Sequence, residues 1–215
     1  MTPTPTFSTD ATAFFSDLTT DNSRSFWAAN KPRFEREVAT PMRELTEGLA
    51  PVFGPFKTFR MHRDVRFSAD KSPYKTMHGA AATTDGGSVY YLHLDAEGVQ
   101  VASGAYAFAR DQLARFREAL LDDDAGAAFA DAISQTEHAG TAVTSGGPDP
   151  LKRAPRGVDP EHPRIEWLRW KGAAAMARIG IAEATFETIA ARWTAAQPLV
   201  VWLDAHVGPS TESRF

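Results

Sequence analysis

The chain of 215 residues contains no cysteine, and this absence removes several chemistries at once. Without thiols there is no disulfide framework, no thiolate zinc site, no iron–sulfur cluster and no cysteine nucleophile. A metal site would need histidine and carboxylate ligands instead. We predict no metal and no cofactor, so any chemistry must rely on Arg, Asp, His, Lys and Tyr side chains.

Long apolar runs are also missing. The strongest, residues 199–203, is five residues long, whereas about 20 apolar residues are needed to cross a bilayer. The first 23 residues hold no Lys or Arg and no long apolar run, which fits neither a secretory signal nor a transit peptide. We therefore expect a soluble cytoplasmic protein without a membrane partner. Nothing in the composition indicates an oligomeric state.

Hydrophobic periodicity divides the chain into helices, then antiparallel strands, then helices. The predicted helices cover about residues 10–19, a stretch from 23, 34–52, 110–121, a stretch around 129–133, 166–170, 183–194 and 198–207; the predicted strands cover 59–67, 78–84, 88–95, 99–107 and 173–179. Thr40 before Pro41 has the pattern of an N-cap followed by proline, which predicts two abutting helices or a kink. Asp95 to Gly98 predicts a tight turn within a hairpin.

This order predicts the α+β class, with an antiparallel sheet packed against N-terminal and C-terminal helices. We expect a single domain over residues 1–215, in which about residues 1–8 form a flexible tail. The Gly- and Pro-rich stretch 144–163 is long for a structureless connection, so it predicts a functional loop or a linker.

Positive charge is concentrated in residues 57–75. This segment holds six basic and two acidic side chains, a formal charge of +4, whereas the whole chain carries −4. The remainder of the chain therefore sums to −8. Alternation over 59–67 places Arg60, His62, Asp64 and Arg66 on one face of the predicted strand.

An arginine cluster of this kind offers planar donors for phosphate or carboxylate groups. We interpret the segment as a site for a small anionic ligand, bound by cationic and phenolic side chains: Arg60, Arg63, Arg66, Lys71, Tyr74 and Lys75. Candidate proton-transfer groups are Asp64, His62 and Tyr74. The alternative is an internal network of salt bridges, because the acidic remainder supplies ample carboxylates.

The string from Arg60 to Lys75, RMHRDVRFSADKSPYK, resembles the signature RxxRDxRFSxDKSPYK of a bacterial family called domain of unknown function 2461. Residues 14–15, 22–27, 151–157 and His162 also resemble that family, so the similarity covers nearly the whole chain. The resemblance implies one α+β domain and no established activity. Phe26-Trp27 reverses the family's Trp-Phe order, and position 62 varies in the family.

Two further groupings are weaker. Lys152, Arg153 and Arg156 lie in the 144–163 loop and could complete the anion site or remain solvated. His78, His93 and Asp95 could form a metal site with Tyr91 nearby, but such short patterns arise freely by chance.

Three functions remain open on these grounds. The first is binding of a small anion, with or without catalysis, and we rank it above the others. The second is nucleic-acid binding, for which one compact basic segment supplies few phosphate contacts. The third is a structural or interaction protein whose arginines are all internally paired.

Overall fold

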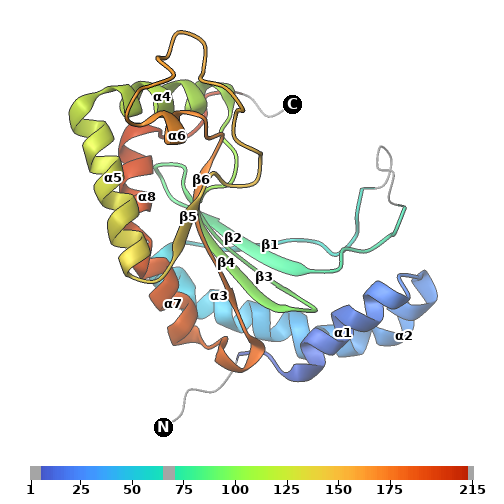
Figure 1. Cartoon of the computed structure of the whole chain (residues 1–215). Helices are drawn as coiled ribbons and strands as arrows, with labels where there is room; N and C mark the ends of the chain where they lie inside the picture. The colour runs from blue at the N-terminus through green and yellow to red at the C-terminus, as the bar shows by residue number, and fades with distance from the viewer. Residues whose placement is uncertain (1–5, 65–70, 213–215) are drawn as a thin grey trace. The chain divides into compact units, whose positions relative to one another are not determined.

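The computed structural model describes residues 6–64 and 71–212 (Figure 1). Its helices are α1 (Thr9–Thr20), α2 (Arg24–Phe34), α3 (Thr40–Phe53), α4 (Arg110–Leu121), α5 (Asp123–His138), α6 (Ile165–Leu168), α7 (Phe186–Ala195) and α8 (Gln197–His206), with a π-helical turn η1 (Glu35–Ala39) and a 3-10 turn η2 (Ile181–Glu183). Its strands are β1 (Lys57–Thr58), β2 (His78–Thr83), β3 (Val89–Asp95), β4 (Gly98–Ala105), β5 (Ala142–Thr144) and β6 (Ala173–Ile179).

The strands form one sheet in the order β1-β2-β3-β4-β6-β5. The predicted α+β class is confirmed, as is an antiparallel sheet accompanied by N-terminal and C-terminal helices. The chain groups into two compact units: unit 1 comprises residues 1–82, 91–101 and 178–191, and unit 2 comprises 83–90, 102–177 and 192–215. A single domain over residues 1–215 stays a prediction.

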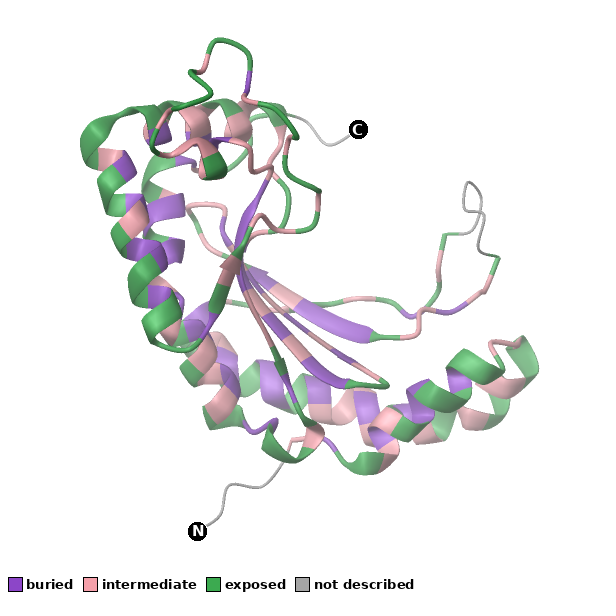
Figure 2. Cartoon of the chain, viewed as in Figure 1, coloured by how far each residue is buried: buried purple, intermediate pink, exposed green. Residues whose placement is uncertain are grey.

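The β3–β4 hairpin follows its sequence pattern closely. Along β3, Leu92 and Leu94 are fully buried while the odd-numbered positions are half-buried, so Figure 2 shows alternating colours on this strand. Gly98 opens β4 with φ of 123°, a conformation that L-residues with a side chain rarely adopt. A Cβ at this position would also lie 2.7 Å from the carbonyl oxygen of Ile179. The predicted tight turn is therefore confirmed, and glycine is required at its end.

The N-terminal helices join without a loop. The predicted start of a new helix is confirmed, because α3 begins at Thr40 and places Pro41 in its first turn. The predicted N-cap role of Thr40 is wrong: the preceding residue, Ala39, has helical dihedral angles, and η1 carries the chain directly from α2 into α3. A π-helical turn leaves the apolar spacing nearly unchanged, so the periodicity alone could not distinguish it from a cap.

Unit 1 has a core of aromatic and aliphatic side chains from α1, α3 and the sheet. Phe14 and Leu18 of α1 are completely buried, as are Leu49 of α3 and Leu92 of β3. Phe7 is 2% exposed and the Thr6 N–H donates to a carbonyl of the same unit, so this part of the predicted N-terminal tail is packed.

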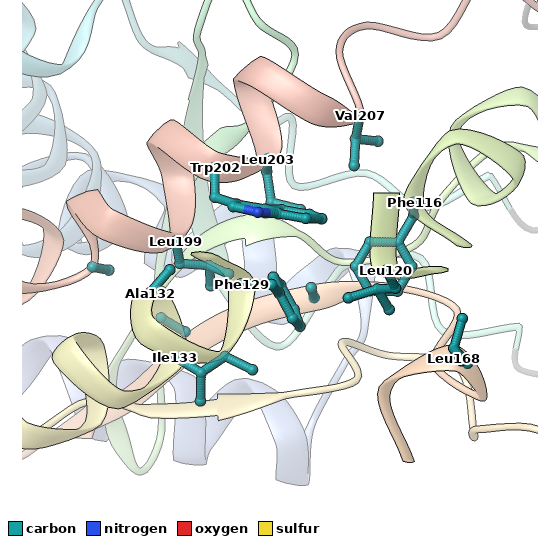
Figure 3. Packing of buried hydrophobic residues seen from close by; sticks show 13 residues of the cluster. Phe116, Leu120, Phe129, Ala132, Ile133, Leu168, Leu199, Trp202, Leu203 and Val207 are labelled. Carbon is teal, nitrogen blue, oxygen red and sulfur yellow. The ribbon is translucent and has the colours of Figure 1, made fainter. Parts of the chain in front are cut away.

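Unit 2 has a separate core, shown in Figure 3. Phe116 of α4, Phe129 of α5 and Trp202 of α8 meet there, with Phe129 only 4.5 Å from Trp202 between ring centroids. The Trp202 indole N–H also donates to the Ala125 carbonyl at 2.9 Å. Among the residues that the model describes, no helix combines the length and apolarity that crossing a membrane requires.

Candidate functional site

The described part of the basic segment beyond β1, residues 59–64 and 71–75, forms an arm between β1 and β2, visible in Figure 1 beyond the ends of these strands. Its two sides are joined by backbone bonds: the Arg63 N–H donates to the Pro73 carbonyl at 2.9 Å, and the Lys75 N–H donates to the Met61 carbonyl at 2.8 Å. The predicted continuous strand over 59–67 is wrong for its described part, because only His62 is bridged, to Tyr74. The arm is thus a narrow antiparallel pair.

Side chains alternate along the arm as the sequence predicted. Arg60, His62 and Asp64 are exposed, whereas Met61 is buried and Arg63 is half-buried. This part of the prediction is confirmed even without a full ladder, because a narrow antiparallel pair retains the two-residue side-chain period. The alternation also predicts Arg66 on the face of Arg60, His62 and Asp64, but this residue lies outside the described residues.

Aromatic rings hold the base of the arm against α2. Trp27 stacks on Tyr74 with a centroid distance of 4.5 Å and an interplanar angle of 16°, and His62 adds an inclined ring 5.0 Å from Tyr74. Phe34 also packs against Trp27, with ring centroids 5.0 Å apart. Tyr74 is consequently 5% exposed, so the structure shows it mainly as a packing residue.

The side-chain amide of Asn22 binds the backbone of Tyr74 at the base of the arm. The amide nitrogen donates to the Tyr74 carbonyl at 3.1 Å, and the amide oxygen accepts from the Tyr74 N–H at 3.0 Å. One side chain thereby satisfies both backbone polar groups of Tyr74, which is itself buried. The contact joins residues 52 positions apart and fixes the arm to the segment before α2.

Replacement of Asn22 by alanine is expected to lower the free energy of unfolding by about 1–3 kcal/mol, because two buried backbone groups lose their partners. Urea denaturation monitored by fluorescence measures the change. Asn30→Ala is the matched control, since Asn30 makes one local bond, to the Phe26 carbonyl. Equal losses for the two variants would contradict a special role for Asn22.

The remaining cationic side chains of the arm differ in exposure. Lys71 is exposed, and Lys75 is half-buried with its Nζ atom 5.6 Å from the centre of the Phe59 ring. Phe59 in turn lies 6.2 Å from the ring of Tyr91 on β3. Contacts through Phe59 therefore connect the cation of Lys75 with Tyr91 on the sheet.

A second group of polar side chains lies on β3. Tyr91, His93 and Asp95 occupy alternate positions and form a hydrogen-bonded chain: His93 Nδ1 is 3.1 Å from the Tyr91 hydroxyl, and His93 Nε2 is 3.1 Å from Asp95 Oδ2. Arg178 of β6 extends this chain by donating from Nη1 to Asp95 Oδ1 at 2.7 Å. The side chains of His93 and Asp95 are 13% and 20% exposed.

The surroundings shift the pKa values of His93 and Asp95, the two acid–base groups of this hydrogen-bonded series. Burial lowers the pKa of His93 below its usual value, against the opposing effect of the Asp95 carboxylate. Burial raises the pKa of Asp95, but the hydrogen bonds from Arg178 and from the Glu97 backbone N–H outweigh it, and the pKa is lowered overall. At neutral pH the chain therefore contains a neutral imidazole and an ionised carboxylate.

The metal arrangement considered for His78, His93 and Asp95 is not formed. His78 packs edge-on against Phe34, with ring centroids 5.3 Å apart, while both ring nitrogens of His93 are engaged by Tyr91 and Asp95. Across residues 6–64 and 71–212, no group of three or more histidine and carboxylate side chains is arranged to hold a metal ion.

Arg153 and Arg156 are exposed residues of the long loop between β5 and α6, and they belong to unit 2. Backbone bonds anchor this loop within the unit, including Leu151 N–H to the Arg169 carbonyl at 2.9 Å and Gly147 N–H to the Tyr106 carbonyl at 2.8 Å. Completion of the anion site by Arg153 and Arg156 stays a prediction.

Sequence reasoning missed two contributors. Asn22 is of a residue type common in turns, and no short sequence pattern connects it with Tyr74. Arg178 sits in the strand 173–179, where its charge was a local signal, but its partner Asp95 lies 83 positions away. The β3 alternation does place Tyr91, His93 and Asp95 on one face, but the sequence offers only a weak metal site or a surface triad as their role.

Comparison with known proteins identifies the family of this chain. The model of a family described as a conserved hypothetical protein (DUF2461) matches residues 10–202, a range that includes the arm, the β3–β4 hairpin and most of α8. No curated protein and no solved structure matches the chain.

Proposed function

The chain belongs to the family called domain of unknown function 2461, and from the geometry of its arm we propose that it binds a small anionic ligand, phosphorylated or carboxylated. The ligand would be held by cationic side chains of residues 60–75. The observation that carries this proposal is Arg60: its side chain is exposed on the arm, and no ion pair or hydrogen bond within the described residues engages it.

Some arginines of the same unit are paired with carboxylates. Arg33 pairs with Asp10 and Asp17, and Arg178 pairs with Asp95. Carboxylates thus neutralise these two arginines, while Arg60, like the exposed Arg24 of α2 and Arg43 of α3, has no ion pair among the described residues. The structural alternative requires every arginine to be paired internally, so the lack of an internal carboxylate partner for Arg60 favours ligand binding at this position.

The arm is also suited to binding because its base is held in place. The Trp27–Tyr74 stack and the Asn22 amide fix the segment from which Arg60 and His62 project. Side chains on a pre-organised support lose less conformational entropy when they engage a ligand. Asp64 is the exposed carboxylate beside them and can orient a cationic neighbour or transfer a proton.

A thermal-shift screen at low salt tests the proposal with inorganic phosphate, pyrophosphate, ATP and citrate as probes. We expect at least one probe to raise the melting temperature, and Arg60→Gln to weaken its binding roughly tenfold or more, because a hydrogen bond to a charged group contributes about 1.5–3 kcal/mol. Arg43→Gln is the matched control: it removes the same charge from an exposed position of α3 in the same unit.

Two results would contradict the proposal. One is no stabilisation by any probe at low salt, and the other is an equal effect of Arg60→Gln and Arg43→Gln. Binding of a single-stranded oligonucleotide that weakens steeply with salt, in the absence of small-anion binding, would favour the nucleic-acid alternative.

A further inference from the structure

The hydrogen-bonded chain of Tyr91, His93 and Asp95 is held in place by its own strand and by the neighbouring strand β2. Leu92 and Leu94 are fully buried on the opposite face of the strand, which fixes the direction in which the odd-numbered side chains project. On β2, Gly79 passes so close that a Cβ there would lie 2.7 Å from the Leu92 carbonyl oxygen and 3.0 Å from His93 Cβ. The imidazole therefore occupies a defined place on the sheet.

Hydrogen-bond chemistry determines which atom donates the proton at each contact between Tyr91, His93 and Asp95. An ionised Asp95 can only accept, so the 3.1 Å contact requires the proton of His93 to reside on Nε2. In the neutral ring Nδ1 is then an acceptor, and the Tyr91 hydroxyl must donate to it across 3.1 Å. Asp95 is itself positioned by Arg178 and by the Glu97 N–H at 2.8 Å.

We propose that Tyr91, His93 and Asp95 form a proton relay that deprotonates a hydroxyl group of a bound ligand at the Tyr91 oxygen. The arrangement is that of a reacting hydroxyl, a base and a group that orients the base, with a phenol in the first position. Tyr91 and His93 carry the proton, and Asp95 is a positioning residue that also stabilises the imidazolium.

The proton step is balanced within these groups. The O–H bond of the ligand breaks and leaves its electron pair on the ligand oxygen, while the proton passes to Tyr91 Oη. The original phenolic proton moves at the same time to His93 Nδ1. The result is a ligand oxyanion, a neutral phenol and an imidazolium paired with Asp95, and the reverse transfer restores the starting state.

The neighbours of Tyr91 indicate the class of ligand. Its ring lies 6.2 Å from Phe59, and Lys75 places a positive charge 5.6 Å from that same ring. A small anion that also carries a hydroxyl group could therefore place its charge toward the arm and its hydroxyl at Tyr91. This choice of ligand rests on the proposed function, whereas the relay itself rests only on the β3 geometry.

Acetylation by N-acetylimidazole tests the relay without any anionic ligand. The acetyl group transfers to the phenolic oxygen as the N–acetyl bond breaks, and the phenolic proton passes through the base to the leaving group, which departs as neutral imidazole. At pH 7.5 we expect Tyr91 to react roughly tenfold or more faster than Tyr106, as measured by peptide mass spectrometry, because general-base assistance typically contributes a hundredfold or more. Tyr106 is the internal reference, since it is 65% exposed and lies outside the relay.

His93→Gln and Asp95→Asn should each reduce the rate at Tyr91 to that of Tyr106 or below, with the Tyr106 rate unchanged as the internal reference and a retained cooperative thermal unfolding transition as the check on folding. In the unaltered chain the rate advantage of Tyr91 should disappear as pH falls and His93, which faces Asp95, Arg178 and Tyr91, becomes protonated. The relay is wrong if Tyr91 reacts no faster than Tyr106 at pH 7.5, or if its advantage persists when His93 is protonated. Either failure would leave the anion-binding result with Arg60→Gln unaffected, so the two proposals are separable.

Discussion

Replacement of Phe129 by alanine is expected to lower the free energy of unfolding by about 3–5 kcal/mol, the range typical of a fully buried phenylalanine. Phe129 is completely buried in the core of unit 2. Its ring lies 4.5 Å from Trp202 and 5.5 Å from Phe116, two neighbours labelled in Figure 3. Trp167 lies 5.4 Å away, so truncation removes contacts with three aromatic neighbours together. The cavity left behind cannot close easily, because the surrounding rings are themselves large and packed.

Urea denaturation followed by tryptophan fluorescence measures this loss. Val201→Ala provides the control on the neighbouring helix α8, because Val201 is 61% exposed and its truncation should change stability by less than about 0.5 kcal/mol. Phe129→Leu should fall between the two, since it refills part of the volume. A loss below about 1 kcal/mol for Phe129→Ala would show that this cluster does not govern the stability of unit 2.

Acidification between pH 6.5 and 4 is expected to destabilise the chain through His78 by roughly 3 kcal/mol. His78 begins β2, is 7% exposed and packs edge-on against Phe34, with no hydrogen-bond partner for Nδ1 among the described residues. Burial, aided by the charge of Lys75, lowers its pKa from 6.5 to about 4. Below pH 6.5 His78 is protonated in the unfolded chain, whereas in the folded chain it stays neutral down to about pH 4. The free energy of unfolding therefore falls as pH falls through this window.

The free energy of unfolding should therefore be measured by urea denaturation at pH 7.5 and 4.5 for the unaltered chain and for His78→Phe. The variant should lose less stability over this interval, by about 2–3 kcal/mol, because phenylalanine retains the packing on Phe34 and cannot be protonated. His93 acts in the same direction, since burial also lowers its pKa, and it remains in both proteins. His138→Phe, at an exposed position of α5, is the control, and an equal response of the two variants would refute the role of His78.

Several elements could be predicted because their signals are local. Strict alternation over Val89–Asp95 and the tight turn before Gly98 define the β3–β4 hairpin, and the alternation of Arg60, Met61 and His62 correctly separates exposed from buried positions. A pattern of period two needs only the neighbouring residues to specify which side chains share a face. The π-helical turn Glu35–Ala39 escaped prediction, because it changes backbone bonding without changing the apolar spacing.

The candidate sites show where local signals end. The sequence by itself determined the α+β class, the concentration of positive charge in residues 57–75 and the shared face of Tyr91, His93 and Asp95, since composition and strand periodicity are properties of short segments. Only the tertiary structure decided which charges are paired. Asn22 reaches Tyr74 across 52 positions and Arg178 reaches Asp95 across 83, whereas Arg60 is left exposed. Partner choice depends on how distant segments pack, and packing energy is spread over many side chains that no short pattern encodes.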